Sequence, residues 1–440
     1  MDITELKKHL EMLMEANSIS SIKHGNLLIN FTRTYDVIWK EFGLGCKRHV
    51  AFWEPLPDSP ASAGYFPLGD LANTEGINVR NQRLVALVQE GDPDSEETRL
   101  KGKALSPPVN YEALWSDSSS NRTKNKCTLW RPIPAPGYVA LGMVCEPGTD
   151  KPSKDRMRCV RTDLVIACDV GDQVWNDGGS GLKTDFSAWS IKPPAATPGE
   201  VYFSAGTFIG AASYTKPARH GVAYALRLKI PPKINPPPPA PVLQGYAAPS
   251  RLEVDTVSYT CDMAWFSVKD PDLSPIQQWQ TSPLYTLERT DRYVLVGFGH
   301  NQTSATQTFK WAVIHGVHGS QARTFTAHTA VDIGAEWHIG VPTSPIKVSA
   351  KLSQSLSRTQ TSTSGWTKTT NFEVTATVPS TKAIAAYLVQ SNYRLLRKDG
   401  TQLSSTVSYT DVNSVYWSEY PPAKECTVDC QAQAARDSAP

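Results

Sequence analysis

The chain has 440 residues, with 44 Lys and Arg against 42 Asp and Glu and a net charge of +2. This even balance gives no reason to expect a nucleic acid or a strongly acidic partner. No stretch reaches the 18 consecutive apolar residues that indicate a membrane-spanning helix. The 33 prolines, 28 glycines and 12 tryptophans suit an all-β protein with many turns, and the length predicts two or three domains.

Residues 1–24 begin with acidic residues and contain no continuous apolar core, unlike a signal peptide. The spacing of Leu6, Leu10 and Leu13 predicts a short amphipathic helix instead. We therefore expect a soluble product that is released or ingested without a classical signal peptide. Most of the eight cysteines are expected to be buried thiols, while Cys426 and Cys430 could form a local disulfide.

The strongest long-range pattern is a threefold repeat between residues 25 and 232. Three tryptophan pairs, 14, 15 and 14 residues apart, are each followed by proline and then by an aromatic and glycine-containing strand: Trp39/Trp53, Trp115/Trp130 and Trp175/Trp189. Short strands in three copies predict a pseudo-threefold β structure in which each unit closes the core of its neighbour.

The blocks "WRPIPAPGYVALG", "RCVRTDL", "WNDGGSG" and "FSAWSIKP" occur in this order and resemble the vacuolar protein sorting protein sixty-two family. The resemblance covers roughly residues 20 to 230 and implies a β-prism-like module. The first copy departs from the pattern at "KEFGLGCK". A site built on the "DGGSG" sequence is therefore least expected in that copy.

Two loops of this region are candidate contacts for a surface receptor, either a glycan or a protein. Glycine frees backbone amides in the first loop, where sugar or phosphate groups could dock. The alternative is a tight turn that needs glycine for positive φ. The candidate residues are Trp175, Asp177, Gly178, Gly179 and Ser180 in the first loop and Trp115 and Asp117 in the second.

Seven of the eleven residues from Pro231 to Pro241 are proline, which predicts a linker over residues 233–250. Residues 251–420 then form a second domain with long alternating strands, among them "YTLERTDRYVLVGFGH" and "SQARTFTAHTAVDIGAEWHIGV". Between Ser353 and Thr377, 13 of 25 residues are Ser or Thr, so this stretch cannot fill a core on both faces.

Residues 331–352 alternate strictly on both sides of the tip Pro342-Thr343-Ser344-Pro345, where the parity changes. In a hairpin this arrangement puts both apolar rows on one face. The apolar row is Val331, Ile333, Ala335, Trp337, Ile339, Val341, Ile346, Val348, Ala350 and Leu352. The opposite face carries Asp332, Glu336, Lys347 and Lys351. A strand over 331–341 has the length that a tilted strand needs to cross hydrocarbon.

An ordinary amphipathic hairpin over a soluble core would show the same alternation. The order of "PLYTLERTDRY", "NQTSATQTFKWAV", this hairpin, the Ser/Thr-rich stretch and "AIAAYLV" resembles the aerolysin-type β-pore-forming toxins, most closely the epsilon-toxin-like branch. The resemblance implies an elongated, aerolysin-like pore-forming domain. It also implies action at a target-cell membrane, with receptor binding and a homo-oligomer. Residues His328 to Leu356 would insert as a β-barrel with an apolar lipid face and a charged lumen face.

Two further features are possible triggers. Protonation of His328 and His338 could loosen the hairpin at low pH, although the polar faces of long strands also carry histidine by themselves. The tail, residues 421–440, is either a propeptide cleaved near Lys424 or a plain terminus.

The sequence contains no catalytic motif and no clustered metal ligands, and it implies no cofactor. We therefore expect a non-enzymatic pore-forming toxin of the insecticidal or cytolytic kind. A non-lytic lectin-like or trafficking-related binding protein is the first alternative, and a hydrolase is the second.

Overall fold

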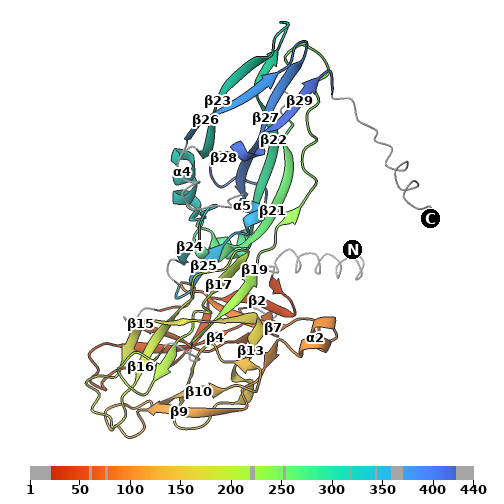
Figure 1. Ribbon diagram of the computed structural model, residues 1–440. Coiled ribbons are helices and arrows are strands. Elements are labelled where there is room, and N and C mark those ends of the chain that lie inside the picture. Colours follow the sequence, from red (N-terminus) through yellow and green to blue (C-terminus); the bar gives the residue numbers. More distant parts are fainter. Residues whose placement is uncertain are drawn as a thin grey trace, which may run out of the picture.

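The computed structural model describes residues 21–58, 62–74, 78–218, 223–250, 254–317, 319–341, 344–357 and 370–422. The molecule is elongated, with a lower part formed by residues 21–230 and an upper part formed by residues 254–422 (Figure 1). These are called the head and the body. The predicted all-β fold is confirmed, since antiparallel sheets build both parts.

Six small sheets form the head, two for each repeat. One sheet of each repeat is three-stranded: β3 (Thr34–Lys40), β4 (Val50–Leu56) and β6 (Leu71–Thr74); β9 (Asn110–Ser116), β10 (Cys127–Ile133) and β12 (Val144–Pro147); β15 (Asp169–Asn176), β16 (Ser187–Lys192) and β18 (Ile209–Ala211). The second sheets contain β1 (Ile22–His24), β2 (Leu27–Thr32), β7 (Val85–Glu90) and β5 (Phe66–Pro67); β11 (Tyr138–Val139), β13 (Cys159–Arg161) and β8 (Leu105–Ser106); and β14 (Val165–Ala167), β19 (Tyr224–Lys229) and β17 (Glu200–Phe203).

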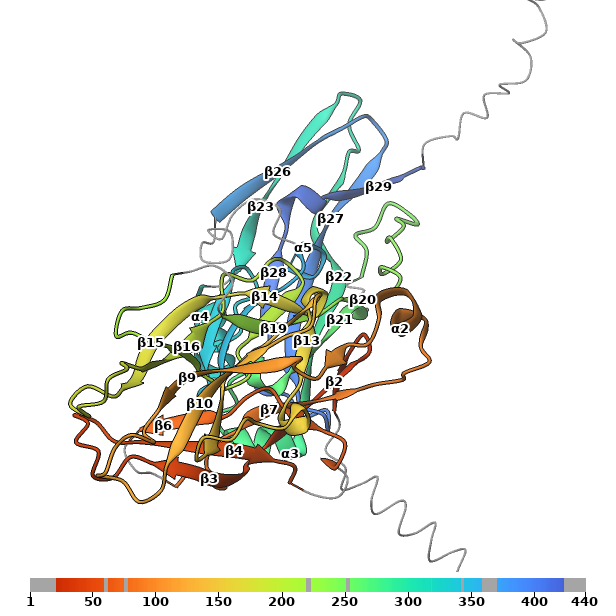
Figure 2. The same ribbon diagram turned by 90° about the horizontal axis from the view of Figure 1, so that it is seen from below.

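One tryptophan from each repeat lies in a common aromatic core. The rings of Trp39, Trp115 and Trp175 meet edge to face with centroids 5.9 to 6.4 Å apart. Each indole N–H also donates to the next repeat. Trp39 donates to the Asn125 carbonyl at 3.1 Å, Trp115 to Asp177 at 2.8 Å and Trp175 to the Arg48 carbonyl at 2.8 Å. This closed cycle links the three repeats, whose strand pairs β3–β4, β9–β10 and β15–β16 are seen from below in Figure 2.

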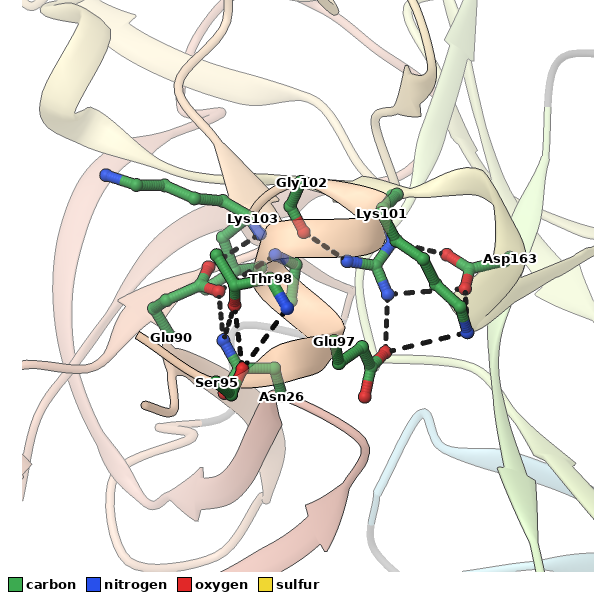
Figure 3. A network of polar contacts seen from close by, with 12 residues as sticks. Asn26, Glu90, Ser95, Glu97, Thr98, Lys101, Gly102, Lys103 and Asp163 are labelled. Atoms are coloured by element: carbon green, nitrogen blue, oxygen red, sulfur yellow. Dashed lines mark hydrogen bonds and ion pairs between the residues drawn. The ribbon is translucent and has the colours of Figure 1, made fainter. Parts of the chain in front are cut away.

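A polar network holds the short helix α2 (Glu96–Lys101) against the edge of the head (Figure 3). The Glu90 carboxylate accepts hydrogen bonds from Asn26 at 2.6 Å and from the backbone amides of residues 104 and 105. The Arg161 guanidinium pairs with Glu97 and Asp163, each at 2.6 Å. Two 3-10 helices, η2 (Lys154–Arg156) and η3 (Thr162–Leu164), flank β13.

The body is built on one large sheet with the order β20-β21-β22-β27-β28-β23-β26, and β29 pairs with β27. The strands are β20 (Lys233–Ile234), β21 (Thr256–Ala264), β22 (Leu284–His300), β23 (Gln307–Val317), β26 (Thr370–Val378), β27 (Ala383–Leu396), β28 (Val407–Thr410) and β29 (Tyr416–Tyr420). The helices are η4 (Trp265–Ser267), α3 (Pro275–Thr281), α4 (Gly319–Thr329), α5 (Gln354–Ser357) and η6 (Val412–Ser414). The long strands β22, β23, β26 and β27 lie where alternation predicted them.

Head and body share one hydrophobic core despite the proline-rich connection between them. Phe266 of the body lies 4.3 Å from Phe203 of the head, centroid to centroid. The Trp279 indole N–H donates to Asn30 Oδ1 across the same junction at 3.1 Å. The junction is therefore a packed interface. Within the described ranges, no helix combines the length and the apolar character needed to cross a membrane.

We expect Trp175→Ala to lower the free energy of unfolding by about 3–5 kcal/mol, because the substitution leaves a large cavity and breaks the tryptophan cycle. Trp175 is fully buried, whereas Trp417 on β29 is 39% exposed and serves as the control. Urea unfolding followed by far-ultraviolet circular dichroism measures both variants. An effect of Trp175→Ala no larger than that of Trp417→Ala would contradict the central role of the cycle.

Candidate functional site

The alternating segment forms a short hairpin of β24 (Trp337–Gly340) and β25 (Lys347–Lys351) at the waist of the molecule (Figure 1). Strand β25 pairs with β17 of the head, with Val201 opposite Ala350 and Phe203 opposite Val348. The hairpin thereby extends the second sheet of the third repeat to the order β14-β19-β17-β25-β24. A segment of the body is thus held as part of the head.

The expected eleven-residue strand over 331–341 is wrong for this structure. Only Trp337–Gly340 is strand, and the preceding stretch, which was also expected to be strand, is helix α4. Phe325 explains the helix, because its buried side chain packs into the shared core from one side of α4. Asp332 explains the loop, because its carboxylate accepts the backbone N–H groups of Gly334 and Ala335 at 2.9 and 3.0 Å. Such local bonds compete with strand pairing.

The hairpin register places Trp337 opposite Ala350 and Ile339 opposite Val348, so both apolar rows lie on one face. This face points into the shared core: Val331, Ile333, Trp337, Val341, Ile346, Val348, Ala350 and Leu352 are buried, and Ile339 and Ala335 are partly buried. A lipid contact for this row stays a prediction. In the present fold the row is already shielded from water by the protein.

Hydrogen bonds across the polar face also fix the hairpin to the head. Ser349 Oγ donates to Glu336 Oε1 at 2.9 Å and accepts the backbone N–H of Ala196 at 2.9 Å. The backbone N–H of Lys347 donates to Ser204 Oγ at 2.9 Å. Of the residues predicted to face a lumen, Lys347 is exposed, and Asp332, Glu336 and Lys351 are partly exposed. Their lumen role stays a prediction.

The hairpin lies within residues 318–369, which connect two strands that pair with each other. Strands β23 and β26 form an antiparallel ribbon from Gln307 opposite Val378 to His315 opposite Thr370. One face of the ribbon is apolar and packs on β22, where Gly297 lies directly under the Trp311 ring and leaves no room for a Cβ. The other face carries threonines and the Lys310–Glu373 ion pair at 2.7 Å.

Both histidines predicted as triggers are exposed. His328 lies on α4, and His338 Nε2 is 3.0 Å from Glu336 Oε1. His338 is thus next to the carboxylate that binds Ser349. A pH-trigger role for either histidine stays a prediction. Lys424, Cys426 and Cys430 lie outside the described residues. Of the N-terminal helix predicted over residues 1–24, residues 1–20 also lie outside them, and the prediction is wrong for Ile22–His24, which form strand β1 and pair with β2.

The head loops predicted to contact a receptor have buried polar side chains. Asp177 is 1% exposed and accepts hydrogen bonds from Trp115, Ser180 and the backbone N–H of Phe186. Asp117 is fully buried and binds Thr123 and the backbone N–H of Cys127. These acids stabilise their own loops, as the turn alternative predicts. A receptor contact through them stays a prediction.

The glycines of the first loop have a steric role. Gly179 has φ +97°, and a Cβ there would lie 2.6 Å from the Gly45 carbonyl oxygen of the first repeat. The backbone N–H of Lys47 also donates to the Gly178 carbonyl at 3.0 Å. Close packing between repeats therefore requires glycine at position 179, and Gly178 contributes through its backbone.

A cavity of about 600 Å³ opens on the head between the second and third repeats. Its walls are mostly apolar and include much of the "RPIPAPGYVALG" block. The lining residues are Arg131, Pro132, Ile133, Pro134, Val139, Ala140, Gly142, Met143, Ile209, Gly210, Ala211, Ala212, Pro217 and Tyr224. Arg131 pairs with Glu112 at 2.6 Å, and both side chains are 50% exposed. The volume is in the range of small-ligand sites.

The pairing of β17 with the hairpin was not predicted, although a strand was expected at this place in the third repeat. Nothing in "EVYF" of β17 indicates a partner in the body, because pairing between distant strands leaves no local periodicity. In the part of the chain that the structure describes, no three His, Cys, Asp or Glu residues gather as metal ligands. The six described cysteines, among them Cys127 and Cys145, are free thiols.

A family model matches the part of the chain that contains the three repeats. The model of the family described as vacuolar protein sorting-associated protein 62 matches residues 10–229, which is half of the chain. The crystal structure of GNIP1Aa from Chromobacterium piscinae is similar with a TM-score of 0.37 and 20% identity over 51% of this chain and 41% of that chain. The chain therefore covers about two fifths of GNIP1Aa. The crystal structure of Cry35Ab1 is similar with a TM-score of 0.32 and 8% identity over 91% of each chain. No curated protein matches.

Acid is expected to weaken the strand that holds the hairpin. Glu200 of β17 accepts hydrogen bonds from the hydroxyls of Thr197 and Tyr202, each at 2.6 Å. Burial alone would raise the pKa of Glu200, but these bonds and the Arg227 guanidinium outweigh it and lower the pKa to about 2. A carboxyl whose pKa is lowered on folding stabilises the fold above its unfolded pKa, and this contribution is lost as the pH falls from about 4.5 toward 2.

Glu200→Gln should therefore flatten the decline of the thermal unfolding midpoint between pH 5 and pH 2.5. The exposed Glu112, changed to Gln, is the control and should leave the decline unchanged. Superimposable profiles for wild type and Glu200→Gln would show that Glu200 does not contribute.

Proposed function

The chain belongs to the vacuolar protein sorting-associated protein 62 family, and we propose that this member is a cytolytic pore-forming toxin. In the proposal the head binds a target-cell surface, and copies of the chain assemble. The hairpin and the flanking helices α4 and α5 then leave the waist, so that residues 318–369 extend the β23–β26 ribbon as one long hairpin. Several such hairpins close into a membrane-spanning barrel, because a hairpin in lipid must have its backbone groups paired on both edges.

The register of the β23–β26 ribbon carries this proposal. If the pairing of Gln307 with Val378 is continued along the chain, Trp337 comes opposite Val348 and Ile339 opposite Ile346, with the turn at residues 342–343. The apolar row then falls on the same face as Phe309 and Trp311. The apolar side chains of the ribbon and those near the tip would then share one face, with polar side chains such as Gln321, Arg323 and Thr329 between them in the same row. The polar face would bear Asp332, Glu336, Lys347 and Lys351.

Leaving the waist requires the head to release the hairpin. The strand pairing between β17 and β25 must break, together with the bonds of Ser349 and Lys347 to the head. Because the apolar row is already buried, transfer to lipid replaces protein contacts instead of removing the row from water. The hydrophobic gain of about 25 cal/mol per Å² is therefore largely offset. Receptor binding and contacts between copies of the chain would therefore have to supply most of the free energy that drives insertion.

A disulfide between head and hairpin should block the pore. Val201 and Ala350 are directly opposite, and such neighbours in antiparallel strands are close enough for a disulfide. We expect oxidised Val201→Cys/Ala350→Cys protein to release no dye from liposomes of target-cell lipids, and reduction to restore release. Carboxyfluorescein dequenching measures the effect.

The matched control is a disulfide that joins the β23–β26 ribbon only to itself. Thr308→Cys/Thr377→Cys links a directly opposite pair in the register that the extension keeps and leaves β17 free, so this variant should release dye when oxidised. Release by the oxidised Val201/Ala350 variant at the wild-type rate would overturn the proposed extension.

The cavity between the second and third repeats is our proposed receptor contact in the head. Its apolar walls could take up an apolar group of a receptor, and the half-exposed Arg131–Glu112 pair at its rim could form hydrogen bonds with polar groups beside it. Of its lining residues, Ala212 is exposed at the mouth and can be enlarged without disturbing the core.

Ala212→Trp should fill the cavity and weaken binding to susceptible cells about tenfold or more. Flow cytometry of labelled protein measures cell binding at a temperature that prevents insertion. Val37→Trp, at an exposed position of β3 in the first repeat, which contributes no residue to the cavity, should bind like wild type. Equal binding by all three proteins would place the receptor contact elsewhere.

The alternative function is a non-lytic binding protein, and the family name keeps this hypothesis open. The two functions differ in one measurement. A protein that binds cells through the head but releases no dye from membranes at any concentration would support the alternative.

A further inference from the structure

A buried charged cluster in the body contacts the segment that the proposed function requires to move. Arg289 on β22 is 2% exposed, and its Nη1 donates to the carbonyl oxygens of Ser355 and Leu356 at 2.7 and 3.0 Å. Both acceptors belong to α5, which follows strand β25 directly. Residues 347–357 are called the waist segment. Arg289 therefore binds two residues of this segment through their backbone carbonyl groups.

The cluster is built on the two longest strands of the body. Arg289 Nη2 donates to Asp291 Oδ2 at 2.9 Å, and Ser391 Oγ on β27 donates to Asp291 Oδ1 at 2.6 Å. The guanidinium also lies 3.8 Å from the ring centroid of Tyr259 on β21. Tyr393 on β27 donates its hydroxyl to the same Leu356 carbonyl at 3.0 Å. The strands thus hold the donors rigidly, while the acceptors belong to the segment.

A charged pair this deeply buried needs hydrogen-bond partners for its remaining donors. Arg289 Nε already has no partner within the described residues. If α5 left, Nη1 would lose both of its acceptors, and a buried donor without an acceptor is costly, most of all a charged one. Departure of α5 therefore meets a penalty that the body sheet imposes and that is separate from the pairing of β25 with the head.

We propose that Arg289 and Asp291 form a latch that keeps residues 347–357 folded at the waist through the backbone of α5. The latch rests on the proposed function in one respect, namely that release of this segment precedes insertion. Arg289 is a positioning residue: it has no contact with lipid or receptor in the proposal and acts by holding two carbonyl groups.

The test compares Arg289→Met with Arg394→Met. Arg394 lies on β27 and pairs with Glu288 of β22, so it joins the same two strands, but it has no hydrogen bond or ion pair with the waist segment among the described contacts. Tyr393→Phe is the milder second variant, because it removes one hydroxyl donor to Leu356 and keeps the ring. If Arg289→Met does not fold, Tyr393→Phe carries the test.

Native-state hydrogen exchange with mass spectrometry measures opening of residues 347–357 against peptides of β2 and β7 in the head. We expect exchange in 347–357 to rise about tenfold or more in Arg289→Met and by less in Tyr393→Phe, with the head peptides unchanged. Arg394→Met should exchange like wild type. Exchange in 347–357 that stays at the wild-type rate, or that rises equally in all peptides, would overturn the latch.

Dye release from liposomes separates the latch from the proposed function. Faster onset of release in Arg289→Met, together with local opening, supports both. Local opening of 347–357 in a protein whose wild type never releases dye upholds the latch and overturns the pore. Unchanged local exchange with normal wild-type release upholds the pore and overturns the latch.

Discussion

The pairing of β25 with β17 is the interaction on which the arrangement of this protein depends. It makes a strand of the body part of a sheet of the head and brings the apolar row of the hairpin into a core that both parts share. Without it, head and body would still meet through Phe266 and Trp279, but the hairpin would not be part of the head. With it, a structural change in the head would be transmitted to the hairpin through four directly opposite residue pairs of β17 and β25.

This pairing changes the energetic account of a pore. An amphipathic hairpin in water would gain free energy simply by entering lipid, but this hairpin has no exposed apolar row to protect. The resting fold is stabilised by the same hydrophobic burial that a membrane would offer. In the proposed pore, the free energy gained by moving this row from protein to lipid would therefore be small, and hydrogen bonds such as that of Ser349 to the Ala196 backbone would contribute a large share of the difference.

Two different devices hold the waist segment. The head holds β25 by strand pairing with β17, and release of β25 requires all four residue pairs to separate. The body holds α5 by a buried charge, which acts on two carbonyl groups only. Because the two contacts lie at different places in the segment, neither has to supply by itself the whole free-energy barrier to release of the segment from the waist. The cavity of the head is lined in part by Tyr224 of β19, which pairs with β17, so a ligand there would bind close to the sheet that carries the hairpin.

Periodicity predicted much of the fold, because it is a local property. The spacing of Trp39, Trp115 and Trp175 indicated the three repeats, and strict alternation indicated the long strands of the body and the common face of the apolar row. It failed at α4, where a β-like sequence is helical because Phe325 reaches the shared core only from a helix in that place.

The sequence by itself therefore determined which side chains share a face and where the repeats lie. Only the tertiary structure decided what each face contacts. The apolar row meets β17, Asp177 turns into its own loop, and Arg289 meets the carbonyls of α5. The physical reason is that such contacts join residues far apart in the chain, and their partners are set by the packing of whole sheets and leave no mark in the local pattern.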